Sequence, residues 1–327
     1  MNVPALSEEK MSQATRALSG LRAELAKALV GQAQVIDEVL IGLLCDAHVL
    51  IEGVPGLGKT LLVKALGKTF DGQMKRIQFT PDLMPSDVVG HTFFDAASNR
   101  FATRQGPIFA HLVLADEINR APAKTQSALL EAMQEKQVTL EGKAQALPRP
   151  FMVLATQNPI EQEGTYPLPE AQLDRFLLKI NIGYPSASDE AALTALVTGG
   201  KTGADLEVEQ VRSLVQPGTV VALQQCAALV EVDQRVLEYA VAIVRATREM
   251  PSIACGAGPR GSIALVRAAR AAALLAERAY VTPDDIKRVA LPALRHRIAP
   301  AADAEIEGLN ADDLLRNVLD KVPAPRN

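Results

Sequence analysis

The sequence predicts an α/β domain with a doubly wound, five-stranded parallel sheet, followed by an all-helical second domain. Between residues 48 and 182, five short apolar runs alternate with stretches of helical periodicity. Such alternation is typical of βαβ units, in which helices cover both faces of a parallel sheet. After Tyr184-Pro185 the strand-like runs stop and helical patterns follow. The length of 327 residues agrees with two domains, because it exceeds what one core usually needs.

The chain begins with an amphipathic pattern. Leucines recur at spacings of three and four over residues 7–29, which predicts a helix. A break at Val30-Gly31-Gln32 precedes a second helical pattern from Val35 to Leu44. We therefore assign residues 1–29 to an N-terminal helix and begin the α/β core at residue 30.

The α/β core is predicted to span residues 30–185. Its five apolar runs, the predicted strands, are residues 48–52, 74–79, 111–115, 151–156 and 177–182. Two segments interrupt the alternation. Residues 81–107 form a polar, turn-rich insert. Residues 136–147 alternate around a turn at Glu141-Gly142-Lys143, which predicts a β-hairpin.

The second domain is predicted over residues 186–300. Its helical patterns cover residues 189–197, 222–229, 233–249, 262–278 and 283–297. Asp233 and Thr282-Pro283 are suitable starts for two of them, because proline is favoured in the first helical turn. Residues 301–327 form a tail with one short helical pattern, Asp312 to Leu319.

Composition narrows the class of protein. A net charge of −4 gives no basic footprint for nucleic acid. The three cysteines lie far apart and the four histidines show no ligand spacing, so we expect buried thiols and no structural zinc. The N-terminus does not resemble a signal peptide, and no apolar run approaches the ~18 residues of a membrane span. We expect a soluble, cytoplasmic protein.

A phosphate-binding loop follows the first predicted strand. Residues 53–60, GVPGLGKT, fit the pattern G-x-x-x-x-G-K-[ST] and precede a helical pattern. Backbone N–H groups of such a loop and the helix N-terminus bind the phosphates of ATP. Lys59 would reach the β- and γ-phosphates, and Thr60 would give its hydroxyl to Mg²⁺. The competing interpretation is a glycine-rich turn before a helix. The predicted ATP-binding residues of this loop are Gly53, Val54, Pro55, Gly56, Leu57, Gly58, Lys59, Thr60 and Leu61.

Polar residues follow two further predicted strands. Asp116 would hold Mg²⁺ through water, and Glu117 would polarise the attacking water as general base. Asn158 follows the fourth strand, where open α/β sheets bind ligands, and would orient that water. The competing interpretations are two solvated acids at a strand end and a turn-forming asparagine before Pro159.

The order of these motifs resembles that of the AAA+ ATPases. It continues with LDRF at residues 173–176 and GPRG at residues 258–261. Three stretches resemble the MoxR family specifically: DEINRAP at 116–122, TQNP at 156–159 and EGTYPLPEA at 163–171. The resemblance covers roughly residues 20 to 300. The insert and the hairpin lie where the helix-2-insert, pre-sensor-1-hairpin clade carries its elaborations.

The resemblance implies roles for individual residues. Asn158 matches sensor 1. Arg175 matches the arginine finger that completes the site of an adjacent subunit, which implies a ring, expected to be a hexamer. Arg260 matches sensor 2 in the helical lid, and in this clade it would act across the subunit interface. The segment Val30, Gly31 and Gln32 matches the one that lines the adenine. Without the resemblance, Arg175 and Arg260 would be interpreted as solvated arginines at helix ends.

MoxR-like ATPases are regarded as chaperones that use ATP and Mg²⁺ to remodel client proteins or to help insert metal cofactors. They typically act with a partner that contains a von Willebrand factor A domain. One alternative is a nucleic-acid motor, but the predicted hairpin at 136–147 sets Lys136 and Lys143 against Glu135 and Glu141 and lacks aromatic residues for base stacking. Another is a nucleotide-gated binding scaffold, which the complete set of hydrolytic residues argues against.

Overall fold

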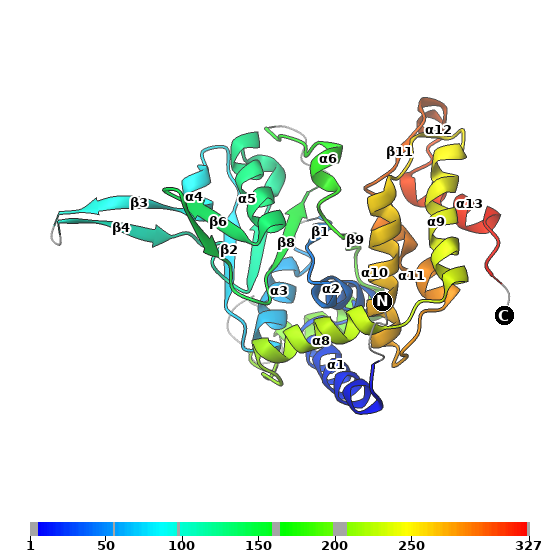
Figure 1. Cartoon of the computed structure of the whole chain (residues 1–327), viewed down its shortest axis with the longest axis horizontal. Helices are drawn as coiled ribbons and strands as arrows, with labels where there is room; N and C mark the ends of the chain where they lie inside the picture. The colour runs from blue at the N-terminus through cyan, green and yellow to red at the C-terminus, as the bar shows by residue number, and fades with distance from the viewer. Residues whose placement is uncertain (1–5, 55, 97–98, 159–163, 199–207, 326–327) are drawn as a thin grey trace.

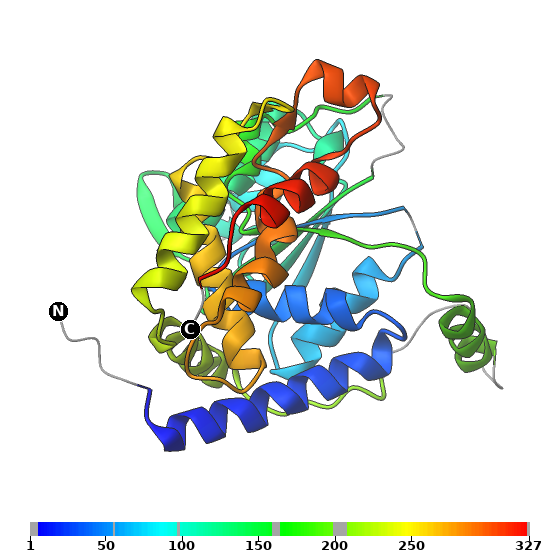
Figure 2. The ribbon, with the colours of Figure 1, turned by 90° about the vertical axis from the view of Figure 1, so that its right-hand side faces the viewer.

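The computed structural model describes residues 6–54, 56–96, 99–158, 164–198 and 208–325. It shows a parallel sheet with helices on both faces and, beside it, a group of long helices from the C-terminal part of the chain (Figure 1). The N-terminal helix runs beneath both parts (Figure 2). This is the predicted α/β domain followed by a helical domain.

The five predicted strands form one sheet. They are β1 (Val49–Glu52), β2 (Met74–Gln78), β5 (Leu112–Asp116), β8 (Met152–Gln157) and β9 (Leu178–Asn181). Their order is β2-β5-β8-β1-β9, and every neighbouring pair is parallel. The carboxyl ends of all five strands therefore lie at one edge of the sheet, and their amino ends lie at the opposite edge.

Both faces of the sheet are buried, which explains why the strands are continuous apolar runs. Val49 and Ile51 of β1 pack in one hydrophobic cluster, and Leu50 between them packs in another. The first cluster includes residues of α1 (Glu8–Ala28), α2 (Ala33–Leu44) and α3 (Lys59–Thr69). The second includes residues of α5 (Ala123–Glu135) and Val88 of the short α4 (Pro85–Val89).

The C-terminal part is helical, as predicted. Its helices are α7 (Ala187–Thr198), α8 (Pro217–Leu229), α9 (Gln234–Glu249), α10 (Pro259–Leu275), α11 (Pro283–Leu294), α12 (Ala302–Ile306) and α13 (Ala311–Lys321). Helices α8 and α10 begin earlier than predicted, each at a proline that suits the first turn. The sequence did not predict α12, nor the three-residue strand β10 (Ile253–Cys255) and the two-residue strand β11 (Ala299–Pro300), which form a small antiparallel ribbon.

A buried carboxylate connects the N-terminal helix, the core and the helical domain. Asp37 of α2 has a side chain only 6% exposed. Its Oδ2 atom accepts a hydrogen bond from Arg22 of α1 at 2.7 Å and another from Arg288 of α11 at 2.5 Å. Because breaking a buried ion pair leaves an uncompensated charge, this contact fixes how the three elements meet.

The two segments that interrupt the core are both β-hairpins. Strands β6 (Gln137–Leu140) and β7 (Lys143–Ala146) confirm the hairpin predicted at 136–147. Its turn residues Glu141 and Gly142 both have positive φ, as a tight hairpin turn requires. The insert at 81–107 was predicted as turn-rich and instead contains a long hairpin of β3 (Gly90–Asp95) and β4 (Arg100–Gln105). That hairpin extends away from the body of the protein (Figure 1).

His48 illustrates how the sheet is held to its neighbouring helix. Its Nδ1 atom accepts a hydrogen bond from the Val153 backbone N–H at 2.9 Å, so the ring proton lies on Nε2, which faces the Met133 carbonyl at 3.0 Å. Burial lowers the pKa of His48 to about 4. The neutral ring therefore packs within the structure as a polar link, and the protonated ring is disfavoured there.

We expect this link to make stability depend on pH. Below about pH 6.5 the unfolded chain protonates His48 while the folded chain does not, until the pH approaches about 4. The free energy of unfolding therefore falls with falling pH, by up to ~1.4 kcal/mol per pH unit from this residue. Urea unfolding of His48→Gln between pH 7 and 4.5 should show a shallower dependence than the parent. His91→Gln, at an exposed position on β3, should keep the parent slope. An unchanged slope in His48→Gln would contradict the assignment.

Candidate active site

The loop of residues 53–60 lies between β1 and α3, at the carboxyl edge of the sheet. Gly56 and Gly58 have φ of +88° and +77°, in the left-handed region that favours glycine. Gly58 is the N-cap of α3, so the positive end of that helix points into the loop. A Cβ atom added to Gly56 would meet nothing within 4 Å, so there is room beside the loop backbone. Pro55 lies outside the described residues.

Lys59 supplies the positive side chain of the loop. Its Nζ atom donates a hydrogen bond to the Gly53 carbonyl at 2.6 Å. Burial lowers the pKa of Lys59, while the nearby Asp116 and Glu117 carboxylates act to raise it. Thr60 is half-buried beside it, and Leu61 turns into the core under the loop. Open space, backbone N–H groups, a helix N-terminus and a lysine together fit the triphosphate of a nucleotide.

The segment Val30-Gly31-Gln32 lies next to this loop. Leu29, which precedes it, comes within 3.9 Å of the Cβ position of Gly58. The Gln32 side chain donates to the carbonyl of Gly183, just after β9, at 3.3 Å. The structure therefore brings the predicted adenine-lining segment beside the predicted phosphate-binding loop, although about twenty residues separate them in the chain.

The acidic pair at the end of β5 is oriented by a threonine. The Thr156 hydroxyl, on β8, donates to Asp116 Oδ1 at 2.7 Å and accepts from the Glu117 backbone N–H at 2.9 Å. Thr156 is fully buried. Glu117 itself has φ 56° and ψ 51°, a left-handed conformation that is uncommon for a residue other than glycine. It begins the turn that leads into η1 (Ile118–Arg120). Strain of this kind clusters at functional sites.

Two residues of the neighbouring strand β2 also hold the acidic pair. Arg76 donates to Asp116 Oδ2 through Nη2 at 2.6 Å and through Nε at 3.1 Å. Gln78 donates to Glu117 Oε2 at 2.8 Å, and Arg120 donates to the same atom at 3.3 Å. Sequence reasoning missed Arg76, Gln78 and Thr156. The spacing of two between Arg76 and Gln78 on a predicted strand was the available signal, because such residues share one face.

Asn158 completes this edge of the sheet. It follows β8, which lies between β1 and β5, and its side chain is buried. The loop, the acidic pair and Asn158 therefore converge within one chain, as expected from the sequence. The predicted Mg²⁺ ligands are the Thr60 hydroxyl and the Asp116 carboxylate. This small number of protein ligands is enough for Mg²⁺, because the ion keeps several bound waters and phosphate oxygens as its other ligands. Among the described residues, no group of three or more His, Cys, Asp or Glu side chains is placed to hold a metal.

Arg175 lies at the opposite edge of the sheet. It comes three residues before β9, whose first residue, Leu178, pairs with Val49 at the start of β1. Its Nη1 atom donates to the carbonyl of Leu130 in α5 at 2.9 Å. At ~3.3 Å per residue, the length of β1 alone separates this edge from the phosphate-binding loop by more than ~10 Å. The chain does not bring Arg175 to its own loop.

Arg260 lies beside Arg175. It is in the first turn of α10, and its Nη1 atom pairs with Asp174 Oδ2 at 3.2 Å. The buried Arg297 pairs with the other carboxylate oxygen of Asp174 at 2.8 Å. A hollow of about 210 Å³ is lined by Asp174, Arg175, Arg260 and Arg297, together with Arg267. The two predicted arginines therefore share one surface, away from the loop.

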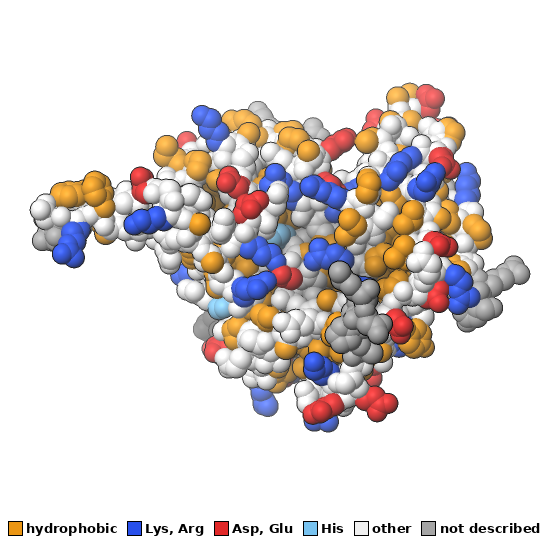
Figure 3. Space-filling view, viewed as in Figure 1, with side chains coloured by type: hydrophobic (Ala, Val, Ile, Leu, Met, Phe, Trp, Pro, Cys, Tyr) orange, Lys and Arg blue, Asp and Glu red, His pale blue; other side chains and the backbone are white. Residues whose placement is uncertain are grey.

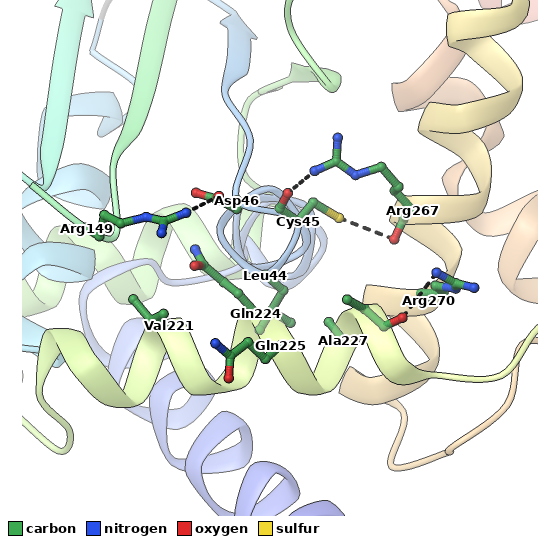
Figure 4. Close-up of a pocket in the computed structure, with 11 residues that line it drawn as sticks. Leu44, Cys45, Asp46, Arg149, Val221, Gln224, Gln225, Ala227, Arg267 and Arg270 are labelled. Carbon is green, nitrogen blue, oxygen red and sulfur yellow. Dashed lines mark hydrogen bonds and ion pairs between the residues drawn. The ribbon is translucent and has the colours of Figure 1, made fainter. Parts of the chain in front are cut away.

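A second hollow, of about 420 Å³, adjoins the first through Arg267 and lies between the end of α2 and the sides of α8 and α10 (Figure 4). Arg149 and Arg270 also line it. Cys45 sits in its wall, donating through Sγ to the Arg267 carbonyl at 3.3 Å. Burial raises the pKa of that thiol to about 12, so it stays a neutral packing group. The face that carries Arg175 is thus rich in arginine, which suits contact with an anionic group.

Comparison with known proteins agrees with the geometry. Residues 48–178 match the family model described as the ATPase family associated with various cellular activities (AAA). Residues 245–318 match the model of the AAA lid domain. The first range includes the phosphate-binding loop, the acidic pair, Asn158 and Arg175, and the second, which includes Arg260, runs from the last part of α9 into α13.

Similar proteins match over nearly the whole chain. Chaperone MoxR1 of Mycobacterium tuberculosis is 43% identical, over 93% of this chain and 81% of its own length. Protein MoxR of Methylorubrum extorquens is 33% identical, over 92% and 93%. A crystal structure from Cytophaga hutchinsonii is 41% identical and superposes with a TM-score of 0.89, covering 98% of both chains. No helix among the described residues combines the length and the apolar character that crossing a membrane requires.

The position of Thr156 gives a testable prediction. Replacing it with valine keeps the shape but removes both hydrogen bonds to the acidic pair, so turnover of ATP should fall by about 10- to 100-fold. The Mg²⁺ concentration for half-maximal rate should rise, because Asp116 loses its orientation. Thr156→Ser, which keeps the hydroxyl, should recover most of the rate. Equal loss in both variants would show that Thr156 acts through packing alone.

Proposed function

The chain belongs to the MoxR family of AAA+ ATPases, and on this premise we propose that it hydrolyses ATP in a ring of identical subunits to remodel or mature client proteins. The observation that carries the proposal is the division of the site between two edges of the sheet. The loop, the acidic pair and Asn158 lie at the carboxyl edge, while Arg175 and Arg260 lie at the other. One chain holds both halves of a site that only two chains complete.

In the proposed reaction, the loop and Lys59 bind the phosphates of ATP, and Val30, Gly31 and Gln32 line the base. Bound Mg²⁺ would neutralise charge on the phosphates, with Thr60 and Asp116 on its protein side. Glu117 would accept a proton from the attacking water, and Asn158 would orient that water. Glu117 first has to leave Gln78 and Arg120, which hold its carboxylate in this structure.

Arg175 and Arg260 of a neighbouring subunit would stabilise the negative charge that develops on the transferred phosphate. An arginine supplied in trans accelerates such reactions by about 10³–10⁵. The arginine-rich surface around Asp174 would thus face the carboxyl edge of the next subunit. Such head-to-tail contacts close into a ring when the rotation between neighbouring subunits allows it. We propose a hexamer, following the family.

The client-directed role follows from family membership and from the relative that is named a chaperone, MoxR1 of Mycobacterium tuberculosis. We propose that the protein acts with a partner that contains a von Willebrand factor A domain. Remodelling would serve folding or insertion of a metal cofactor in the client. ATP turnover in the ring would move the parts of the chain that are connected to the acidic pair, and these parts would act on the client.

The base is tested by Glu117→Gln. This change keeps the size and polarity of the side chain but removes its proton-accepting carboxylate. We expect ATP binding close to that of the parent and turnover reduced by at least ~100-fold. Binding is measured with a fluorescent ATP analogue, and turnover by phosphate release. Near-normal turnover would contradict the role of Glu117.

The shared site is tested by mixing two inactive variants. Arg175→Ala should bind ATP but turn over slowly, and turnover of the parent should rise with protein concentration. Mixed with an equal amount of Glu117→Gln, it should recover about one quarter of the parent rate, because half the subunits carry Glu117 and half their neighbours carry Arg175. Arg235→Ala, which removes an exposed arginine of α9, serves as the control and should behave as the parent. If mixing recovers nothing while Arg175→Ala alone stays active, each subunit works independently and the ring mechanism is wrong.

A further inference from the structure

We propose that the β3–β4 hairpin binds an extended, apolar segment of a client polypeptide, which adds to a free edge of the hairpin as a further strand. The proposal rests on the client-directed role given above and names the surface that meets the client. It begins from three exposed aromatic side chains. Phe93, Phe94 and Phe101 are 44%, 53% and 77% exposed. Hydrophobic side chains gather at the outer end of the hairpin, far from the body of the protein (Figure 3).

Cross-strand pairing separates the side chains of the hairpin onto two faces. Phe94 pairs with Phe101, and their rings contact edge to face at 5.4 Å. On the same face, Thr92 lies opposite Thr103 with their hydroxyls 3.4 Å apart. We call these four residues the phenylalanine face. It carries aromatic rings and hydroxyls and no charged side chain.

The charged residues of β4 lie on the other face. Arg104 pairs with His91, and Arg100 is one residue before Phe101. Phe93, two residues after His91, lies on this same face, with its ring 6.3 Å from that of His91. Because side chains alternate along a strand, both arginines point away from the phenylalanine face. A surface for single-stranded nucleic acid needs aromatic rings and phosphate-binding cations on the same side. The arginine-bearing face has one such ring, Phe93, whereas the paired rings of Phe94 and Phe101 lie on the face without charge. The phenylalanine face therefore suits an apolar polypeptide better than a nucleic acid.

The backbone of the hairpin is available for pairing. Strands β3 and β4 form a two-stranded sheet, so among the described residues neither has a strand partner along its outer edge. Unpaired N–H and C=O groups along an edge are a template for an added strand. An isolated hairpin is also marginally stable, and a third strand would stabilise it. An added strand would place alternate side chains beside the rings of Phe94 and Phe101, which selects apolar residues at every second position.

The hairpin is connected to the site of ATP hydrolysis. At its base, the Gln105 side chain donates to Gln145 of β7 at 3.2 Å. The segment that leads into it is held to α5, where the Thr125 hydroxyl donates to the Leu83 carbonyl at 2.6 Å. Helix α5 follows the η1 turn that begins at Glu117. A change at Glu117 therefore has a short, packed route to the hairpin.

The test uses the full-length protein and a fluorescein-labelled peptide of about twelve residues, alternating valine and threonine between terminal lysines, with binding followed by fluorescence anisotropy. The double variant Phe94→Ser/Phe101→Ser should weaken binding by about tenfold or more, because aromatic anchors dominate such surfaces. Basal ATP turnover should be unchanged, since neither residue touches the ATP site. Tyr184→Ser/Ile306→Ser removes two comparably exposed apolar side chains, 78% and 84% exposed, from other surfaces and should bind as the parent does.

A second peptide tests strand addition itself. N-methylation of alternate backbone amides keeps every side chain but removes the donors on one edge, and we expect binding weaker by about tenfold. Equal binding of both peptides would overturn strand addition. A parent that turns over ATP but does not bind the peptide would overturn the hairpin proposal and leave the ATPase ring intact. If the parent binds the peptide but does not turn over ATP, the hairpin proposal stands and the proposed ATPase ring is overturned.

Two further outcomes would also overturn the proposal. If single-stranded oligo-dT binds, and Arg100→Ala/Arg104→Ala abolishes that binding, the hairpin is a nucleic-acid surface. If Phe94→Ser/Phe101→Ser lowers the mass of the oligomer in light scattering without changing peptide affinity, the phenylalanine face is a contact between subunits. Retained peptide binding in Arg100→Ala/Arg104→Ala, together with its loss in the phenylalanine variant, would support the proposal.

Discussion

The structure depends on the burial of one parallel sheet on both of its faces. Parallel strands need helical crossovers, and the crossovers cover the faces. The order β2-β5-β8-β1-β9 then sets where every functional side chain lies. All carboxyl ends meet at one edge, so the loop after β1, the acids after β5 and Asn158 after β8 converge. The same geometry sends the residues before β9 to the far edge, so Arg175 lies away from the phosphate-binding loop of its own chain.

Within the converged edge, hydrogen bonds control the acidic pair. Thr156 links Asp116 and Glu117 from the adjacent strand, while Arg76 and Gln78 hold the same carboxylates from the other side. These contacts keep two like charges close together beside Lys59, whose partly buried ammonium compensates them. The acidic pair is thus positioned and restrained, and in the proposed reaction Glu117 would have to be released from these contacts. A neighbouring subunit and the bound nucleotide are the groups that would release it.

The two surfaces proposed to meet other molecules differ in their chemistry. Around Asp174, several arginines gather on one face, and anionic charge at a subunit boundary is the natural complement of such a surface. On the β3–β4 hairpin, aromatic rings stand in solvent beside strand edges that have no strand partner in the described part of the chain, and an extended apolar segment is the proposed occupant. Both surfaces connect to the carboxyl edge, one through the proposed ring contact and the other through α5. In the proposed mechanism, this connection would carry a change at the ATP site to both surfaces.

The sequence alone determined the local features. The five apolar runs, the glycine-rich loop with Lys59 and Thr60, and the pair Asp116–Glu117 are local patterns, because strand burial and phosphate binding constrain neighbouring residues. The hairpin at 136–147 could also be predicted, from the residues of its turn. What only the tertiary structure decided depends on residues distant in the chain. Arg76, Gln78 and Thr156 reach the acidic pair through strand order, and Arg260 meets Asp174 because α10 packs near the start of β9. The β3–β4 hairpin escaped prediction because an exposed hairpin lacks the alternation of apolar and polar residues that burial of one face imposes.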